Sequence, residues 1–245
     1  MPPAPGPLGL DTNTPALDAG TLCLQQSKPP GPLCGVTGPA ATAAPALDAQ
    51  TRKLAAIAFG EASTANDPDE IGGIAWAVAN RCRAWGGKTV DQLLTADPNY
   101  TYAVKDGNAR YGQFMGATTA QIAADPGMKL AREWAENALA SRGKDPSNGA
   151  YWWDGKDFKT NFKNHPKVKD GFRFGDPSHN IFGVKEPVND ETVTYWTAKK
   201  NGVLVNVKER GRYTAVWVST AAHGSTIFWT HPQDYLTATG GKSYR

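Results

Sequence analysis

Glu61 is the residue of this sequence that is best placed for acid–base chemistry. It closes an apolar stripe of Leu54, Ile57 and Ala58, whose i, i+3, i+4, i+7 spacing with Glu61 is that of one helix face. The C-terminal end of a helix disfavours an anion, and partial burial also disfavours the charged form of a carboxyl group. Both effects predict a raised pKa for Glu61, as a proton donor needs near neutral pH. The alternative is a solvated glutamate at a frayed helix end.

A second carboxylate would decide between two kinds of glycoside chemistry. Glu70 is the nearest acidic side chain that could serve, but Asp67-Pro68-Asp69-Glu70 has the pattern of a helix start. Asp67 would be the N-cap, Pro68 the first helical residue, and Glu70 would reach back as in a capping box. We therefore expect Glu70 to be structural, and Asp97 and Asp106 remain as further acidic residues.

Aromatic and amide side chains gather in two further stretches. The first, from Asp97 to Gly116, contains Tyr111, Gln113 and Phe114, and the second is Tyr151-Trp152-Trp153. Aromatic rings stack on the C–H faces of sugars, while amides bond their hydroxyl groups. Both stretches could therefore bind a glycan. The alternatives are a loop held by its own aromatic residues and a strand packed between two layers.

The elements that would position these residues are helical in the first half of the chain. Apolar periodicity and capping signals predict helices over 47–60, 68–83 and 89–94, and another that opens at Asp125-Pro126 and stops at Gly143. The polar stretch 97–116 is expected to be a loop or a two-stranded flap.

The second half changes to a β pattern. Residues 150–154 are predicted to form a strand and 155–178 to be irregular. Alternating apolar residues between Thr192 and Trp229, with a hairpin signal at Asn201-Gly202, predict a small antiparallel sheet. The expected fold class is α+β, a mainly helical domain with an appended β segment.

Composition excludes several classes of function. The 245 residues carry a net charge of +3, and the basic residues are scattered, so nucleic acid is not an expected partner. No run of about 18 or more apolar residues is present to span a membrane. Cys23 and Cys34 could pair in an oxidising compartment, whereas Cys82 lies on an apolar helical stripe and is expected to be a buried, inert thiol.

The sequence motifs do not favour a metal site or a catalytic nucleophile. The four histidines show no H-E-x-x-H pattern, so a zinc amidase would need dispersed ligands. No Gly-x-Ser-x-Gly motif or phosphate-binding glycine loop is present, and Cys82 is not at a helix start. We expect no metal and no cofactor.

Five motifs in order resemble the cell wall hydrolase family of spore-cortex-lytic enzymes (SleB/CwlJ type). They are Ile57–Ala62, the helix Ile71–Arg81, Gly112-Gln113-Phe114, Asp145–Trp153 and His179-Asn180-Ile181-Phe182, with Ser178 where that family usually has glycine. The resemblance covers about residues 51–183. It does not extend to the first 47 residues or to the C-terminal β segment, and residues 156–176 look longer than is usual in the family.

This resemblance implies a lysozyme-like fold that cleaves the glycan strand of peptidoglycan. Glu61 matches the single catalytic glutamate of that family, which acts first as a general acid and then as a general base. The implied glycan-binding residues are Tyr111, Gln113, Phe114, Tyr151, Trp152, Trp153, His179 and Asn180. Of these, His179 and Asn180 are expected to support the groove rather than to react. Lysozyme-type hydrolysis normally needs a second carboxylate, whereas a lytic transglycosylase uses the sugar's own 6-hydroxyl group. We favour the transglycosylase, with a muramidase, an amidase or a non-catalytic glycan-binding module as alternatives.

The sequence also predicts an organisation and a place of action. Residues 1–47 are rich in Pro, Ala and Gly and are expected to be a leader or linker, 48–185 the enzymatic domain and 186–245 a β-rich extension. The first residues lack the basic and apolar segments of a standard secretory signal. We therefore expect delivery to the periplasm or cell wall by a secretion apparatus, by a phage or from a longer precursor. An immunity protein that blocks the groove is the expected partner of an antibacterial effector.

Overall fold

The computed structural model describes residues 46–187 and 191–243, which belong to one compact unit spanning Ala44–Arg245. Almost all of the expected leader, with Cys23 and Cys34, lies outside the described residues. Among the residues described, no helix is long and apolar enough to cross a membrane.

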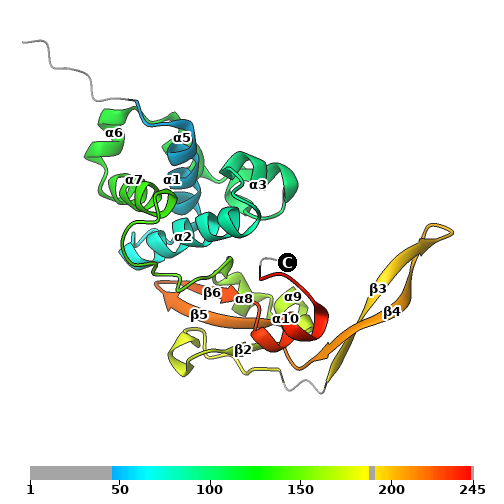
Figure 1. The fold of residues 1–245 in the computed structure, drawn as a ribbon. Coiled ribbons are helices and arrows are strands. Elements are labelled where there is room, and N and C mark those ends of the chain that lie inside the picture. Colours follow the sequence, from blue (N-terminus) through cyan, green and yellow to red (C-terminus); the bar gives the residue numbers. More distant parts are fainter. Residues whose placement is uncertain (1–45, 188–190, 244–245) are drawn as a thin grey trace, which may run out of the picture. The chain divides into compact units, whose positions relative to one another are not determined.

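The chain forms an α+β fold in which most helices precede most strands (Figure 1). The helices are α1 (Ala49–Glu61), α2 (Pro68–Ala84), α3 (Val90–Ala96), α4 (Tyr102–Lys105), α5 (Ala109–Gly116), α6 (Thr119–Ala124), α7 (Pro126–Leu139), α8 (Asp157–Thr160), α9 (Pro166–Asp170) and α10 (Gln233–Thr239), with 3-10 turns η1 (Phe162–Asn164) and η2 (Pro177–His179). The strands are β1 (Trp152–Asp154), β2 (Phe172–Phe174), β3 (Thr192–Lys200), β4 (Val203–Tyr213), β5 (Trp217–His223) and β6 (Thr226–Thr230).

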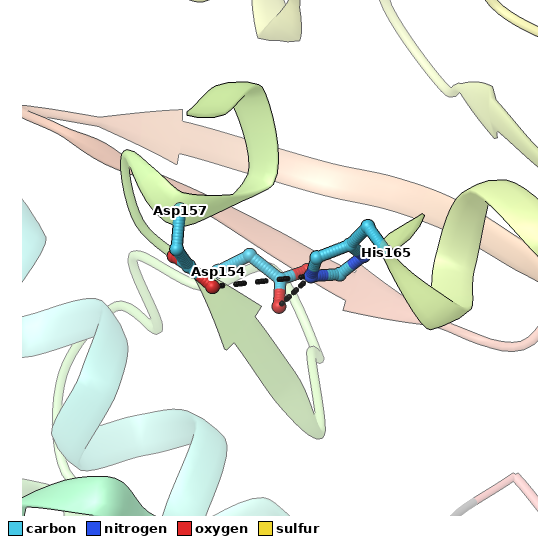
Figure 2. Close-up of side chains that lie close together, drawn as sticks. All are labelled: Asp154, Asp157 and His165. Atoms are coloured by element: carbon cyan, nitrogen blue, oxygen red, sulfur yellow. Dashed lines mark ion pairs between the residues drawn. The ribbon is translucent and has the colours of Figure 1, made fainter. Parts of the chain in front are cut away.

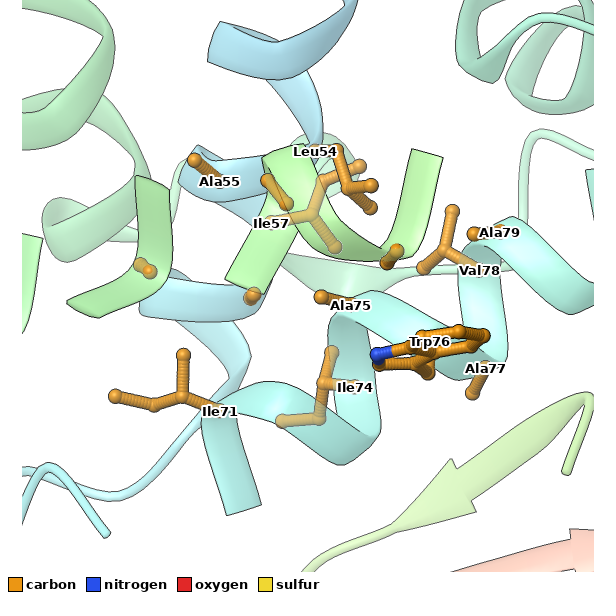
Figure 3. Packing of buried hydrophobic residues seen from close by; sticks show 14 of the residues in the cluster. Leu54, Ala55, Ile57, Ile71, Ile74, Ala75, Trp76, Ala77, Val78 and Ala79 are labelled. Atoms are coloured by element: carbon orange, nitrogen blue, oxygen red, sulfur yellow. The ribbon is translucent and has the colours of Figure 1, made fainter. Parts of the chain in front are cut away.

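The helical core forms where α1, α2 and α7 pack together. Leu54, Ile57 and Ile74 are completely buried there, and Figure 3 shows their side chains converging from α1 and α2. Three aspartates start these helices: the side chains of Asp48, Asp67 and Asp125 each accept backbone N–H groups of the first turn. The sequence predicts the caps Asp67 and Asp125, whereas the cap Asp48 was not predicted. These caps fix where the three helices begin, and α1 ends at Glu61, with Ala62 as its C-cap.

A four-stranded sheet in the order β1-β6-β5-β2 forms the second layer. β6 is antiparallel to both of its neighbours, whereas β2 runs parallel to β5. The sheet therefore combines two strands from before residue 185 with two from the region expected to be a C-terminal extension. Phe158, Phe172 and Trp229 form a second core cluster on it.

Two expectations about local structure are wrong. The stretch 97–116 is neither a loop nor a flap but contains α4 and α5, and Gly112-Gln113-Phe114 lies within α5. Asn108 caps α5 by accepting the backbone N–H of Tyr111, a signal hidden among the glycines and tyrosines around it. The stretch 155–178 is not irregular either, because it holds α8, η1, α9, β2 and the start of η2.

β3 and β4 form a separate two-stranded sheet. The turn between them is Asn201-Gly202, as predicted, and both residues have positive φ angles of 52° and 81°. Such angles are those of a type I′ turn, which matches the twist of a hairpin.

Gly73 is a position where the helical layer meets the sheet closely. A Cβ atom there would lie 2.4 Å from Cζ of the fully buried Phe228. Packed interiors have no room for an added methyl group, so we expect Gly73→Ala to lower the free energy of unfolding by about 1–3 kcal/mol, despite alanine's better helix propensity. Urea unfolding measures this. Gly112→Ala in α5, where a Cβ would meet nothing within 4 Å, is the control and should be neutral or stabilising.

Candidate functional site

Glu61 lies in a cleft of about 590 Å³. Glu61, Thr101 and Tyr102 from the helical layer line this cleft, together with Trp152, Trp153 and Asp154 of β1. An acidic side chain and a set of aromatic rings therefore face the same space. The size is that of a site for a small molecule or a few sugar rings.

The Glu61 carboxyl group is fixed through one oxygen. Oε1 accepts hydrogen bonds from Thr101 Oγ1 and from the backbone N–H of Ala103, the latter at 2.6 Å. Oε2 has no hydrogen-bond partner in the part of the chain that the structure describes. One oxygen thus orients the half-buried side chain, and the other remains available to a ligand in the cleft.

The end of α1 is held by residues from the segment expected to be a loop. Asn108 Nδ2 donates to the Gly60 carbonyl oxygen at 3.0 Å, and Arg110 Nη1 donates to the Ala62 carbonyl oxygen at 2.7 Å. The Arg110 guanidinium also lies over the Phe59 ring, 4.0 Å from its centroid. A cation and an amide at the helix C-terminus satisfy carbonyls that have no partner within the helix. Glu61 is therefore placed by α5 as well as by α1.

The aromatic wall of the cleft is braced by a buried arginine. Arg81 lies with its guanidinium carbon 4.3 Å from the Tyr100 ring centroid and 5.0 Å from that of Trp152, and its Nη2 bonds Asp97 at 2.7 Å. Trp153 meets Tyr100 edge-on at 5.3 Å. Cation–π contacts of this kind strengthen when water is excluded. Asp97 lines the cleft, but its charge is committed to Arg81.

The turn before β1 is locked to α2. Asn80 Nδ2 donates to Asp145 Oδ2 at 2.8 Å and to the Ala150 carbonyl oxygen at 3.2 Å. Asp145 in turn accepts the backbone N–H groups of Ser147 and Gly149. These bonds set the position of the strand that follows, and so of Trp152 and Trp153. Two of the motifs quoted above therefore contact each other directly.

The two tryptophans lie on opposite sides of β1, as alternation in a strand requires. Trp153 packs against the helical core, whereas Trp152 packs against the second cluster on the sheet. Both rings are half-buried and both line the cleft. Each ring therefore has a packing role and also borders the cleft, as a strand between two layers allows.

A cluster of charged residues lies at the end of β1 and contains Asp154, Asp157 and His165 (Figure 2). The His165 ring nitrogen Nε2 lies 3.4 Å from Asp154 Oδ1 and 3.9 Å from Asp157 Oδ2. His165 Nδ1 accepts the backbone N–H of Lys167, so the proton of the neutral ring is on Nε2 and points to Asp154. Lys167 Nζ lies 2.9 Å from the other oxygen of Asp154. Two cationic or donor groups therefore hold the Asp154 carboxylate.

The same cluster has the composition of a metal site. One ligand atom each from Asp154, Asp157 and His165 lie within 4.8 Å of one another. However, the Lys167 ammonium group already neutralises Asp154, and a divalent cation would have to displace it against charge repulsion. The arrangement suits a carboxylate held in a fixed position better than a bound cation.

The structure does not bring all predicted site residues to the cleft. The Phe114 side chain is completely buried in the helical core, so the prediction that it binds substrate is wrong. Tyr111 packs against the same core and does not line the cleft. Gln113 lines a different hollow, with α6 and the start of α7.

Three other predicted residues brace the sheet side. His179 Nδ1 and Ser219 Oγ share a hydrogen bond of 2.8 Å, and the Asn180 side chain exchanges bonds with the backbone of Val184. Tyr151 stacks edge-on against Trp152 at 5.8 Å. None of the three lines the cleft. His179 and Asn180 were expected to brace the groove, but their bonds hold β5 and the loop before Val184 instead.

Glu70 is structural, but not in the way predicted. Its side chain does not reach back to the N-cap; it is completely buried. Its two oxygens accept hydrogen bonds from Ser63, from the backbone N–H of Ser225 and from Thr226 Oγ1. Glu70 thus ties α2 and the end of α1 to the turn between β5 and β6. Asp106 is exposed at the end of α4 and does not line the cleft.

Sequence reasoning missed several residues of the cleft. Asp154 directly continues the Tyr151–Trp153 run and could have been found as its next strand position. Arg81 is the last residue of a quoted motif. Thr101 and Lys167 gave no signal of their own in the sequence. Tyr102 belongs to the tyrosine-rich stretch 97–116 that was expected to suit sugars, but it was not selected as a site residue.

Cys82 is buried and free, as expected. Burial raises the pKa of its thiol to about 11 from a usual value of 9.0. The folded state holds this proton more tightly than the unfolded chain, so its contribution to stability is complete below pH 9 and is lost as the pH rises towards 11.

We therefore expect Cys82 to resist iodoacetamide at pH 8 in the native protein and to react in denaturant. The measurement uses the Cys23→Ser/Cys34→Ser variant, in which only Cys82 can react. Rapid native labelling, read by mass spectrometry, would contradict a buried thiol.

Comparison with known proteins identifies no relative: no family model, curated protein or solved structure matches this chain.

Proposed function

We propose that this protein cleaves the glycan strand of bacterial peptidoglycan, with Glu61 as the proton donor. The observation that carries the proposal is the placing of Glu61: it ends α1 inside an aromatic-lined cleft, anchored by Oε1 and with Oε2 unbonded among the described residues. The family resemblance in the sequence supports the same interpretation, since the Asn80 and Asp145 motifs position the cleft wall.

The chemistry follows from this arrangement. Oε2 of Glu61 would protonate the glycosidic oxygen between N-acetylmuramic acid and N-acetylglucosamine as the bond breaks. The rings of Trp152, Trp153 and Tyr102 would stack on the sugar faces and hold the bond beside the acid. In the transglycosylase route, the ionised Glu61 then takes the proton of the 6-hydroxyl group as that oxygen attacks the anomeric carbon. The product ends are 1,6-anhydro sugars.

A second candidate is a muramidase, because a second carboxylate lines the same cleft. Asp154 is fixed by His165 and Lys167 and could either stabilise positive charge on the sugar or orient a water molecule. The preference for the transglycosylase rests on the lack of such a group in the sequence pattern. Asp154 supplies that second carboxylate in the structure, so hydrolysis is the alternative to the transglycosylase reaction.

We expect Asp154→Asn to slow cleavage by about 10²-fold, since removal of one preorganised electrostatic group has an effect of this order. Asp106→Asn is the matched control: its side chain is exposed at the end of α4 and does not line the cleft, so its rate should stay within about threefold of wild type. Thermal unfolding of both variants separates lost catalysis from the instability of an unpaired Lys167. Equal rates for a folded Asp154→Asn and wild type would remove Asp154 from the mechanism.

Mass spectrometry of purified sacculi treated with the protein tests the proposed function. Anhydro-muropeptides support the transglycosylase, and reducing-end muropeptides support the muramidase. Free stem peptides would indicate an amidase and overturn the proposal. Binding to sacculi without any released product would indicate a glycan-binding module and overturn it as well.

A further inference from the structure

The β3–β4 hairpin carries a concentration of exposed apolar side chains. Trp196, Val203, Leu204 and Val207 are 53–64% exposed. Of the nine large apolar side chains that are exposed in the described part of the chain, five lie on this hairpin, Tyr195 being the fifth. Single exposed apolar residues are normal on a protein surface, but a cluster marks a surface that contacts something.

The tip of the hairpin is apolar on both of its faces. Val203 and Leu204 are neighbours in β4 and therefore project to opposite sides of the two-stranded sheet. Each is 64% exposed. A protein partner that docks on one flat face would cover only one of them, whereas a fluid apolar phase surrounds a tip on every side.

Lysines accompany these residues in register. Lys199 pairs with Leu204 and Lys200 with Val203 across the hairpin, and Trp196 pairs with Lys208. None of these three lysines forms an ion pair within the described residues. Residues 192–213 contain five cationic side chains and one acidic side chain, a net charge of +4. The tip thus combines aliphatic chains with unneutralised ammonium groups.

We propose that this hairpin docks on the surface of an anionic phospholipid bilayer. Val203 and Leu204 enter the boundary between headgroups and acyl chains, while Lys199 and Lys200 extend to the lipid phosphates. Trp196 lies further from the tip, at the level where aromatic rings favour the interface.

Charge and shape favour a bilayer surface over a second copy of the chain or a nucleic acid. A second copy of the chain would bring two hairpins of charge +4 together, which is repulsive at low salt. A nucleic acid would meet the lysines but leave Val203, Leu204 and Val207 without an apolar environment. The bilayer surface satisfies both groups of side chains.

The hairpin is attached to the rest of the unit through α10. Arg210 Nε donates to the Thr239 carbonyl oxygen at 3.0 Å, and its guanidinium lies 4.6 Å from the Trp196 ring centroid. None of the hairpin residues lines the Glu61 cleft. Lipid binding and glycan cleavage can therefore fail independently.

Flotation of the full chain with vesicles tests this inference. With vesicles of phosphatidylethanolamine and phosphatidylglycerol we expect binding that weakens at about 0.5 M salt, and little binding to pure phosphatidylcholine. Lys199→Glu/Lys200→Glu and Val203→Asp/Leu204→Asp should each lower binding at least tenfold. The control is Lys159→Glu/Lys163→Glu, which reverses two exposed lysines outside the hairpin and should bind nearly as wild type.

A measurement on the wild-type chain tests the inference even if the hairpin variants misfold. Hydrogen–deuterium exchange with and without anionic vesicles should show protection confined to about residues 195–208. Absence of vesicle binding, protection elsewhere, or hairpin variants that bind as wild type would overturn the inference. Two other results would also overturn it if the protein does not bind lipid. One is a dimer in sedimentation that the hairpin variants no longer form, and the other is a nucleic-acid complex that they no longer form.

Discussion

Glu61→Gln is expected to lower the rate of peptidoglycan solubilisation by about 10³-fold, since a general acid contributes roughly 10²–10⁴-fold. Glutamine retains an oxygen that can accept the bonds from Thr101 and from the Ala103 backbone, so the side chain should keep its place. What it lacks is an acidic proton that can be transferred to the glycosidic oxygen. The measurement is the fall in turbidity of a sacculus suspension with equal amounts of each protein.

The matched control is Glu133→Gln on α7, whose side chain is 53% exposed and lies outside the cleft. It should have the wild-type rate. A pull-down with sacculi gives a second measurement, since Glu61→Gln should still bind them through the aromatic wall. A folded Glu61→Gln protein with the wild-type rate would rule out the proposed acid.

Glu70→Ala is expected to have the largest effect on stability, a loss of about 3–5 kcal/mol in the free energy of unfolding. The carboxylate is completely buried and accepts bonds from Ser63, Ser225 and Thr226, so its removal leaves those donors without a partner and opens a cavity. Gly224 lies so close that a Cβ there would be 2.7 Å from Glu70 Oε2. The carboxylate therefore fills its site closely, and alanine would leave that site empty.

Urea unfolding followed by circular dichroism measures the effect. Asp69→Ala is the control, because Asp69 is the exposed neighbour of Glu70 in the first turn of α2 and interacts only weakly with the helix dipole. We expect its cost to stay below about 1 kcal/mol. Equal effects of the two substitutions would show that the buried bonds of Glu70 contribute little.

The helical half of the fold was predictable because its signals are local. Asp67 and Asp125 sit directly before apolar-periodic runs, and a cap needs only its own first turn. The Asn201-Gly202 turn is local in the same sense. The α+β class followed from these two kinds of pattern.

The rest depended on contacts between distant residues. β2 is a short strand that pairs with β5 from far along the sequence, as Phe172 does with Trp217, and a three-residue strand has too few residues for a period. α4 and α5 are short helices held by tertiary bonds, such as that of Asn108 to Gly60. Their tyrosines and glycines resemble a loop when seen without those bonds.

The residues of the candidate site also fall into two groups, those recognisable in one stretch of sequence and those that only the fold brings together. Glu61, Trp152 and Trp153 were identified because a helix end and an aromatic run are visible in one stretch of sequence. Asp154 and Lys167 were not, since only the fold brings α9 to the end of β1. Phe114 was assigned to the substrate from its motif and residue type, and burial assigns it to the core.

The most direct test is a crystal structure of the Glu61→Gln variant with an oligosaccharide of alternating N-acetylglucosamine and N-acetylmuramic acid. The account predicts sugar rings against Trp152 and Trp153, with one glycosidic oxygen within hydrogen-bonding distance of the amide side chain at position 61. An oligosaccharide bound elsewhere on the protein, or with no glycosidic oxygen near that position, would contradict it.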